Sequence, residues 1–419
     1  MDQKLPNRWL VLLLLLGIAI FNQADRFLLA ALVDPIKADF SVSDGVMGLL
    51  MGPAFAVFYS TLAIPIAIYA DRASRIKIIV TGCVVWSIFT ILCGYAIGPW
   101  TLALARMGVG VGEAAFQAPA YSLIAAYFAT EQRGRAFAVM ATATYLGQML
   151  GYGIGPQIAA AAHWRNAFEA FGVGGLLIIL AAWAIIREPR RETAGDARPP
   201  FFPLARRLFA LPSYSGMAIG MAIGVLSGVG FGLWAATLFA RNYDMTMAAA
   251  GAAFGSAFVI PGLLGAALFG FIADWAARGD YGRILKLSAI ALCLATLSLI
   301  GTTWSPTLGW ALGWAVPAGL IGGGWAVGIY AGLQYILPDK LRATGTAIAM
   351  LSVNLLGYVC GPWLVGLASN AFGEGRDGLR MALTIVVPVG LVGALLLWRA
   401  AQHLIEDKEK LSAPDAEYR

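Results

Sequence analysis

Residues 9–33, WLVLLLLLGIAIFNQADRFLLAALV, decide the fold because this stretch is apolar along most of its length and yet charged in its second half. At a rise of about 1.5 Å per residue, a helix of this length can cross the hydrocarbon core of a bilayer. Asn22, Gln23, Asp25 and Arg26 therefore lie at membrane depth. A bare charge there costs roughly 2.5–3.5 kcal/mol. We expect the rest of the protein to make these charges tolerable and useful.

A second apolar segment, residues 101–128, carries charges of both signs. Its polar and small residues recur at helical spacing on one face: Arg106, Gly110, Glu113, Gln117 and Tyr121. Helical rise sets Glu113 about 10 Å deeper in the membrane than Arg106. Asp25 and Arg26 fall between these depths, so both acid–base pairings between the two helices are open.

The composition is that of an all-α, polytopic membrane protein. Of the 419 residues, 59% are hydrophobic and only 12% are charged, with a mean hydropathy of +0.75. A soluble domain carries about 25% charged residues. The formal net charge is +6, but the basic residues are spread over short loops, which argues against a nucleic-acid partner. All four cysteines lie inside apolar segments without metal-ligand spacing, so we expect free thiols and no metal or cofactor.

The apolar segments predict twelve membrane spans. They lie at 9–33, 45–70, 77–97, 101–128, 136–160, 167–187, 214–240, 247–273, 284–304, 308–336, 343–371 and 379–401. Between the sixth and seventh spans the sequence becomes polar, Pro-rich and Arg-rich. We therefore expect an N-terminal bundle at 1–187, a cytoplasmic linker at 188–212, a C-terminal bundle at 213–402 and a cytoplasmic tail at 403–419.

The distribution of basic residues predicts the orientation in a cell (inner) membrane. If both termini are cytoplasmic, most of the 29 Lys and Arg residues fall on the cytoplasmic side. Arg26 and Arg106 lie within the membrane. The outer side then holds Lys37, Arg165, Arg241, Arg376 and Arg380. Such a bias is typical of cytoplasmic loops.

The two halves repeat each other. Asp71 is followed four residues later by Arg75, as Asp274 is by Arg278, and Gly-Pro pairs end glycine ladders at 155–156 and 361–362. Both repeats have an offset of about 200 residues. The chain therefore reads as two pseudo-symmetric six-helix bundles, with a site near their interface and alternating access by rocking. The glycines let helices approach closely.

Several motifs resemble a known superfamily. DRASR at 71–75, Arg106 followed by Gly110 and Gly112, and GYGIGP at 151–156 are similar to signatures of the major facilitator superfamily. DRF at 25–27, DPIK at 34–37 and RMGVGVGEA at 106–114, with Trp234, resemble its Spinster branch. That resemblance implies a proton-linked transporter of lysophospholipids or sphingolipid-like amphiphiles. Anion symporters of the superfamily carry a stretch similar to GVGEA.

Our mechanistic hypothesis assigns Asp25 and Glu113 as proton carriers. The two histidines, His163 and His403, lie at loop and terminal positions. Protonation of one acid frees Arg26 or Arg106 to bind a phosphate or carboxylate. The alternative interpretation is a purely structural ion-pair network. Because buried pairs of that kind are often replaceable by apolar packing, we favour a working role.

Other residues are assigned to gating and to substrate binding. The resemblance implies a cytoplasmic latch made of Asp71, Arg72, Arg75, Asp274 and Arg278, although positive-inside charge explains these residues in part. Candidate substrate contacts are Arg26, Arg106, Gln117, Tyr121, Trp234, Tyr330, Asn354 and Tyr358. For each aromatic or amide residue of the second half, the alternative is a packing or helix–helix hydrogen-bonding role. A charged first half facing an apolar, aromatic second half suits an amphiphile with one polar head.

The sequence thus predicts a monomeric, proton-coupled secondary transporter of an amphiphilic small molecule or lipid, embedded in the bilayer. A symporter of small organic anions such as sugar acids is the first alternative, and a membrane sensor or scaffold without transport is the second. We expect no enzymatic activity and no ATP-driven transport, because the chain has no phosphate-binding loop or nucleophile arrangement.

Overall fold

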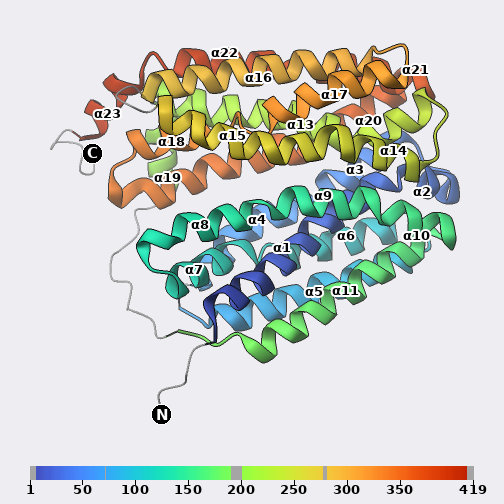
Figure 1. Cartoon of the computed structure of the whole chain (residues 1–419), viewed down its shortest axis with the longest axis horizontal. Helices are drawn as coiled ribbons and strands as arrows, with labels where there is room; N and C mark the ends of the chain where they lie inside the picture. The colour runs from blue at the N-terminus through green and yellow to red at the C-terminus, as the bar shows by residue number, and fades with distance from the viewer. Residues whose placement is uncertain (1–5, 71, 190–200, 277–280, 413–419) are drawn as a thin grey trace. The chain divides into compact units, whose positions relative to one another are not determined.

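The computed structural model describes residues 6–70, 72–189, 201–276 and 281–412, and every regular element in these ranges is a helix (Figure 1). The chain divides into two compact units. One comprises Met1–Asp196 with Asp244–Gly255, and the other Ala197–Tyr243 with Ser256–Arg419. The segment Asp244–Gly255, which follows α13 in the chain, belongs to the first unit. The predicted all-α, two-bundle membrane fold is confirmed.

The first unit is built from eleven helices that follow one another along the chain, joined by α14 from later in the sequence. They are α1 (Arg8–Ala31), α2 (Val33–Phe40), α3 (Asp44–Met51), α4 (Pro53–Ala70), α5 (Arg75–Gly94), α6 (Pro99–Glu113), α7 (Gln117–Tyr127), α8 (Thr130–Ala141), α9 (Ala143–Gly153), α10 (Gly155–Ala161), α11 (Trp164–Ile185) and α14 (Met247–Phe254).

The second unit contains the remaining elements, two of them π-helical. They are α12 (Phe201–Phe209), α13 (Pro212–Asn242), η1 (Gly255–Val259), α15 (Ile260–Ala276), α16 (Tyr281–Thr303), α17 (Leu308–Gly322), α18 (Val327–Ile336), α19 (Asp339–Ser352), η2 (Val353–Val359), α20 (Cys360–Ala371), α21 (Gly375–Val386), α22 (Val389–Ala400) and α23 (Leu404–Ser412). Helix α12 lies within the predicted linker, and α23 within the predicted tail.

Ten helical segments of the described chain are long and apolar enough to cross a membrane. The two other predicted spans, the fourth and fifth, are interrupted. The fourth consists of α6 and α7, separated by a turn at 114–116, and the fifth consists of α8, α9 and α10. The tenth span has an equivalent break between α17 and α18, where Gly322, Gly323 and Gly324 occur in succession. The same place in each repeat is therefore irregular.

Glycines bring α9 and α1 into backbone contact. A Cβ atom added at Gly151 would lie 2.8 Å from the carbonyl oxygen of Ala24, and one at Gly147 would lie 2.8 Å from that of Ile20. In the second unit, a Cβ at Gly361 would lie 2.7 Å from the carbonyl oxygen of Leu226 on α13. The glycine ladders predicted from the sequence thus serve close helix approach in both repeats, and in the first they fix α1.

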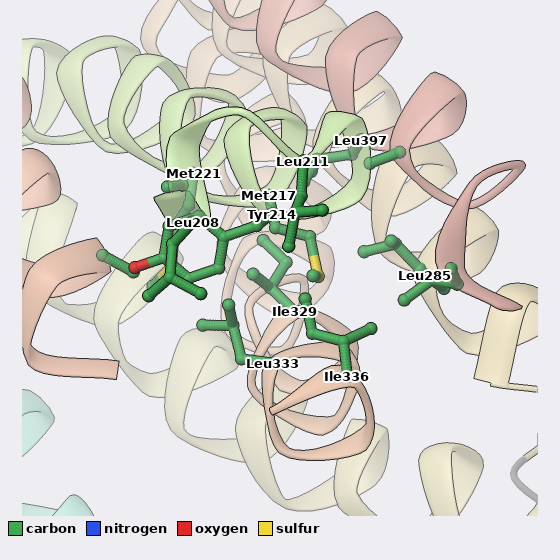
Figure 2. Close-up of a cluster of buried hydrophobic side chains, with 14 of the residues drawn as sticks. Leu208, Leu211, Tyr214, Met217, Met221, Leu285, Ile329, Leu333, Ile336 and Leu397 are labelled. Atoms are coloured by element: carbon green, nitrogen blue, oxygen red, sulfur yellow. The ribbon is translucent and has the colours of Figure 1, made fainter. Parts of the chain in front are cut away.

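The second unit has an apolar core that includes side chains of α12 and of the first turns of α13 (Figure 2). Tyr214 and Met217 of α13 pack with Ile329 and Leu333 of α18, and Leu208 of α12 belongs to the same cluster. Helix α23 covers this core, and its fully buried Asp407 accepts a hydrogen bond from the backbone N–H of Ser213, at 2.8 Å. A carboxylate at the N-terminus of α13 is favoured by the helix dipole.

A buried charge quartet as the candidate functional site

Four charged side chains meet inside the first unit, and we call them the charge quartet: Asp25, Arg26, Arg106 and Glu113. Asp25 and Arg26 are neighbours on α1, which the glycines of α9 hold in place. Arg106 and Glu113 are two turns apart on one face of α6. Asp25 is 2% exposed, and Arg106 and Glu113 are each 1% exposed, whereas the Arg26 side chain is 13% exposed. The structure thus brings together the four residues that the sequence predicts.

Arg26 pairs with Glu113. Its Nε and Nη2 atoms both lie 2.8 Å from the same oxygen of the carboxylate, Oε2. The other oxygen, Oε1, is buried and has no hydrogen-bond partner among the described residues. The pair therefore engages only one side of the Glu113 carboxylate.

Arg106 pairs with Asp25, more loosely. Nη1 of Arg106 lies 3.4 Å from Oδ2 of Asp25, and the hydroxyl of Thr90 on α5 donates to that same oxygen at 3.0 Å. Within the described part of the chain, Oδ1 of Asp25 and Nε of Arg106 are buried without a partner. Each acid of the quartet thus keeps one oxygen to which a proton can be added.

Two aromatic rings of α4 lie against the guanidinium groups. The Cζ atom of Arg26 lies 4.8 Å from the ring centroid of Phe55 and 4.4 Å from that of Tyr59. The Cζ atom of Arg106 lies 5.1 Å from the same Phe55 ring. These distances are within the range of cation–π attraction. Neither aromatic residue is among the site residues predicted from the sequence.

The other polar residues predicted on this face lie next to the quartet. Gln117 begins α7 and accepts a hydrogen bond from the Tyr59 hydroxyl at 3.0 Å. Tyr121, one turn further on, stacks on Phe137 with ring centroids 5.2 Å apart. Gln117 is therefore connected to the quartet through Tyr59, whereas Tyr121 contacts α8.

The predicted substrate contacts in the second unit differ from one another in burial and in hydrogen bonding. Trp234 is fully buried, and its indole N–H donates to the carbonyl of Pro362 on α20 at 3.0 Å. This hydrogen bond connects α13 to α20, and the assignment of Trp234 as a substrate contact stays a prediction. Tyr330 is exposed, with its hydroxyl 3.4 Å from the sulfur of Met350. Asn354 and Tyr358 are half-buried on the π-helical η2, a conformation that is frequent at functional sites.

Of the predicted latch residues whose side chains the structure describes, Arg75 has the most extensive contacts. This buried side chain donates from Nε to Glu188 at 2.7 Å and from Nη1 to the carbonyl of Ser122 at 3.2 Å. Burial opposes ionisation of Glu188, but hydrogen bonds from Arg75, the Ile76 N–H and Ser74 outweigh it and lower the pKa of this carboxyl below its usual value. Both partners lie in the first unit, so this contact ties α5 to the chain that follows α11.

Arg72 is the one other predicted latch residue whose side chain lies within the described part of the chain. Arg72 is exposed. Asp71, Arg278 and the side chain of Asp274 lie outside the described residues.

Sequence reasoning missed Thr90, Phe55, Tyr59 and Glu188. A single hydroxyl or ring in an apolar span has the same sequence signature whether it packs or binds. The only available signal was the spacing of Phe55 and Tyr59, one helical turn apart on the span that follows Asp25 and Arg26.

Comparisons with known proteins agree with this architecture. Residues 15–356 match the model of the Major Facilitator Superfamily. An MFS-type efflux pump of Mycolicibacterium smegmatis is 28% identical, over 97% of this chain and 96% of its own length. Human protein spinster homolog 1 is 26% identical, over 96% and 82%. The sphingosine-1-phosphate transporter SPNS2 of Danio rerio is 26% identical, over 93% and 83%.

Solved structures show the same relationship. Two crystal structures of a bacterial homologue of the human lysosomal transporter Spinster superpose with TM-scores of 0.82 and 0.85. Their sequence identities are 26% and 25%, and they cover 96% and 97% of this chain and 98% and 99% of their own. The predicted resemblance is therefore confirmed. This chain belongs to the Major Facilitator Superfamily, in which it is a Spinster-like transporter and not an enzyme.

Proposed function

We propose that this transporter couples the movement of protons to that of a single-tailed amphiphile with an anionic head, such as a lysophospholipid or a sphingolipid-like molecule. The observation that supports this most directly is the geometry of the charge quartet. Two acids and two bases lie in mutual pairs in which only the Arg26 side chain is partly exposed, and each acid keeps one oxygen without a partner among the described residues. Such an arrangement can take up a proton and an anion together.

Proton uptake starts the proposed cycle. Protonation of Glu113 at Oε1 removes its charge and weakens its attraction for Arg26. The Arg26 guanidinium then binds a phosphate or carboxylate head through two parallel N–H groups, a geometry that guanidinium favours. Deprotonation after alternating access restores the Arg26–Glu113 pair and releases the head. Asp25 and Arg106 repeat the same logic, with Thr90 holding the carboxylate.

The distribution of charge supports an amphiphilic substrate. In the described membrane-spanning helices of the second unit, no Asp, Glu, Lys or Arg is buried, whereas the first unit buries three of the four quartet residues. Taking a small polyanion out of water favours cations from both halves. One polar head on the quartet and one apolar tail suit this asymmetry better. The similarity to a sphingosine-1-phosphate transporter points to the same substrate class.

Uptake into proteoliposomes tests the proposal. With an imposed pH difference, we expect wild-type protein to accumulate radiolabelled lysophosphatidylglycerol and not glucuronate. Glu113→Gln and Asp25→Asn should each abolish pH-driven accumulation, while Glu131→Gln, on the exposed surface of α8, should leave it unchanged. If Glu113→Gln and Asp25→Asn still concentrate the lipid, the proton carriers are misassigned. If glucuronate is accumulated instead, the protein is an organic-anion symporter.

A further inference from the structure

Phe55 is the one aromatic ring of the described chain that contacts both guanidiniums of the charge quartet. Its centroid lies 4.8 Å from Cζ of Arg26 and 5.1 Å from Cζ of Arg106. The ring of Tyr59, one turn later on α4, stacks on Phe55 with centroids 5.6 Å apart and an interplanar angle of 18°. Arg26 therefore lies against two ring faces and Arg106 against one.

The sequence around this pair fixes its position. A Cβ atom at Gly110 of α6 would collide with the carbonyl oxygen of Phe55, so the absence of a side chain lets α4 approach the helix that carries Arg106 and Glu113. Phe55 is 3% exposed and Tyr59 is 9% exposed. The Tyr59 hydroxyl is held by Gln117 at 3.0 Å. The two rings are thus part of the packed first unit and have a defined orientation toward the quartet.

An aromatic ring face and a carboxylate attract a guanidinium in different ways. A carboxylate attracts it only while charged, and it also competes with any anionic head for the same N–H groups. An aromatic face attracts the cation through its quadrupole and carries no net charge. It also leaves the edge of the guanidinium plane available to hydrogen-bond an anion.

We propose that Phe55 and Tyr59 are positioning residues that hold the Arg26 and Arg106 guanidiniums in place while Asp25 or Glu113 is neutral, so that the released cations already face the incoming head. This inference rests on the proposed joint uptake of a proton and an anion at the quartet. Because Phe55 contacts both arginines, it also links the two ion pairs, and displacing one guanidinium alters the ring contact of the other.

The first test needs no substrate. In protein labelled with ¹⁵N-arginine, the side-chain N–H signal of Arg26, identified by its loss in Arg26→Lys, should be shifted upfield by the ring currents of Phe55 and Tyr59. The shift should persist in Glu113→Gln, which mimics the protonated acid. It should disappear when Tyr59→Leu and Phe55→Leu are added, and remain with the control Phe58→Leu on the same helix. Loss of the shift in Glu113→Gln alone would overturn the proposal.

The second test separates ring electrostatics from packing. Phe55 is replaced by phenylalanine carrying one, two or three ring fluorines, which progressively weaken the negative ring face with little change in shape. We expect KM for lysophosphatidylglycerol to rise stepwise, by about tenfold at three fluorines. An unchanged KM across the series contradicts the proposal. If wild-type protein moves no lysophosphatidylglycerol, the proposed substrate is wrong, and the arginine spectra still decide the role of the rings.

Discussion

Thr90 lies on α5 with its side chain directed at Asp25, and its hydroxyl donates a shorter hydrogen bond to the carboxylate than Arg106 does, 3.0 Å against 3.4 Å. Thr90 and Asp25 are almost completely buried. A hydrogen bond to a charged group contributes about 1.5–3 kcal/mol, and a buried acceptor that loses its donor pays a desolvation cost. The anchoring of Asp25 therefore depends on an uncharged residue.

Thr90→Val tests this dependence without changing side-chain shape. We expect the free energy of unfolding to fall by about 1.5–3 kcal/mol, measured by thermal unfolding in detergent. Thr61→Val provides the control, since the exposed Thr61 hydroxyl donates only to carbonyls of its own helix among the described contacts. Equal losses in the two variants would show that Thr90 has no special relation to Asp25.

We expect the contact between Glu188 and Arg75 to be sensitive to acid. Its pKa is lowered in the folded protein, so the stability that it contributes is present above the pKa of the unfolded chain and is lost as pH falls through the folded value. Glu188→Gln should cost about 1 kcal/mol at pH 7, because the pair is partly exposed, and should reduce the loss of stability between pH 5 and 3. If the melting temperatures of wild type and variant fall equally across this pH range, Glu188 is not the source of the acid sensitivity. Glu409→Gln, on the exposed side of α23, is the control.

At the scale of elements, the contact between α9 and α1 positions the quartet. Gly151 lies against the backbone of Ala24, immediately before Asp25, so a methyl group there must push the two helices apart. We expect Gly151→Ala to destabilise the protein by about 1–3 kcal/mol and to reduce pH-driven uptake.

Gly153 provides a matched control for Gly151→Ala on the same helix. A Cβ added at Gly153 meets no atom within 4 Å. Gly153→Ala should be neutral or stabilise the helix by up to about 1 kcal/mol. If both substitutions have the same effect on thermal unfolding and uptake, the close approach of α9 to α1 is not what matters.

For the whole molecule, the predicted orientation can be measured by cysteine labelling. With the four native cysteines replaced by alanine, Ile97→Cys, in the exposed turn between α5 and α6, should react with a membrane-impermeant maleimide added to intact cells. Gln402→Cys, exposed between α22 and α23, should react only after the membrane is permeabilised. Labelling of Gln402→Cys in intact cells would reverse the predicted topology.

The fold could be predicted because burying charge in a membrane is expensive and leaves an unmistakable pattern. The same cost identified Asp25, Arg26, Arg106 and Glu113. Helical spacing gave the face on which each residue lies. Both acid–base pairings stayed open because the sequence pattern does not say how one helix is rotated relative to another. The hydrogen bond of Trp234 could not be predicted, because the carbonyl of Pro362 that accepts its N–H comes from a helix distant in sequence. The rings of α4 were missed for a similar reason, since cation contact and packing use the same residue types.

The two acids and two bases of the quartet add up to zero formal charge. One proton and a head group of charge −1 can therefore enter together and leave this sum unchanged. An electrical potential does work only on net charge that crosses the bilayer, about 2.3 kcal/mol per elementary charge per 100 mV. A potassium diffusion potential set with valinomycin should leave the accumulation of a singly charged lipid unaltered. A doubly charged head taken up with one proton would make the transport cycle electrogenic, and accumulation would then follow the applied voltage.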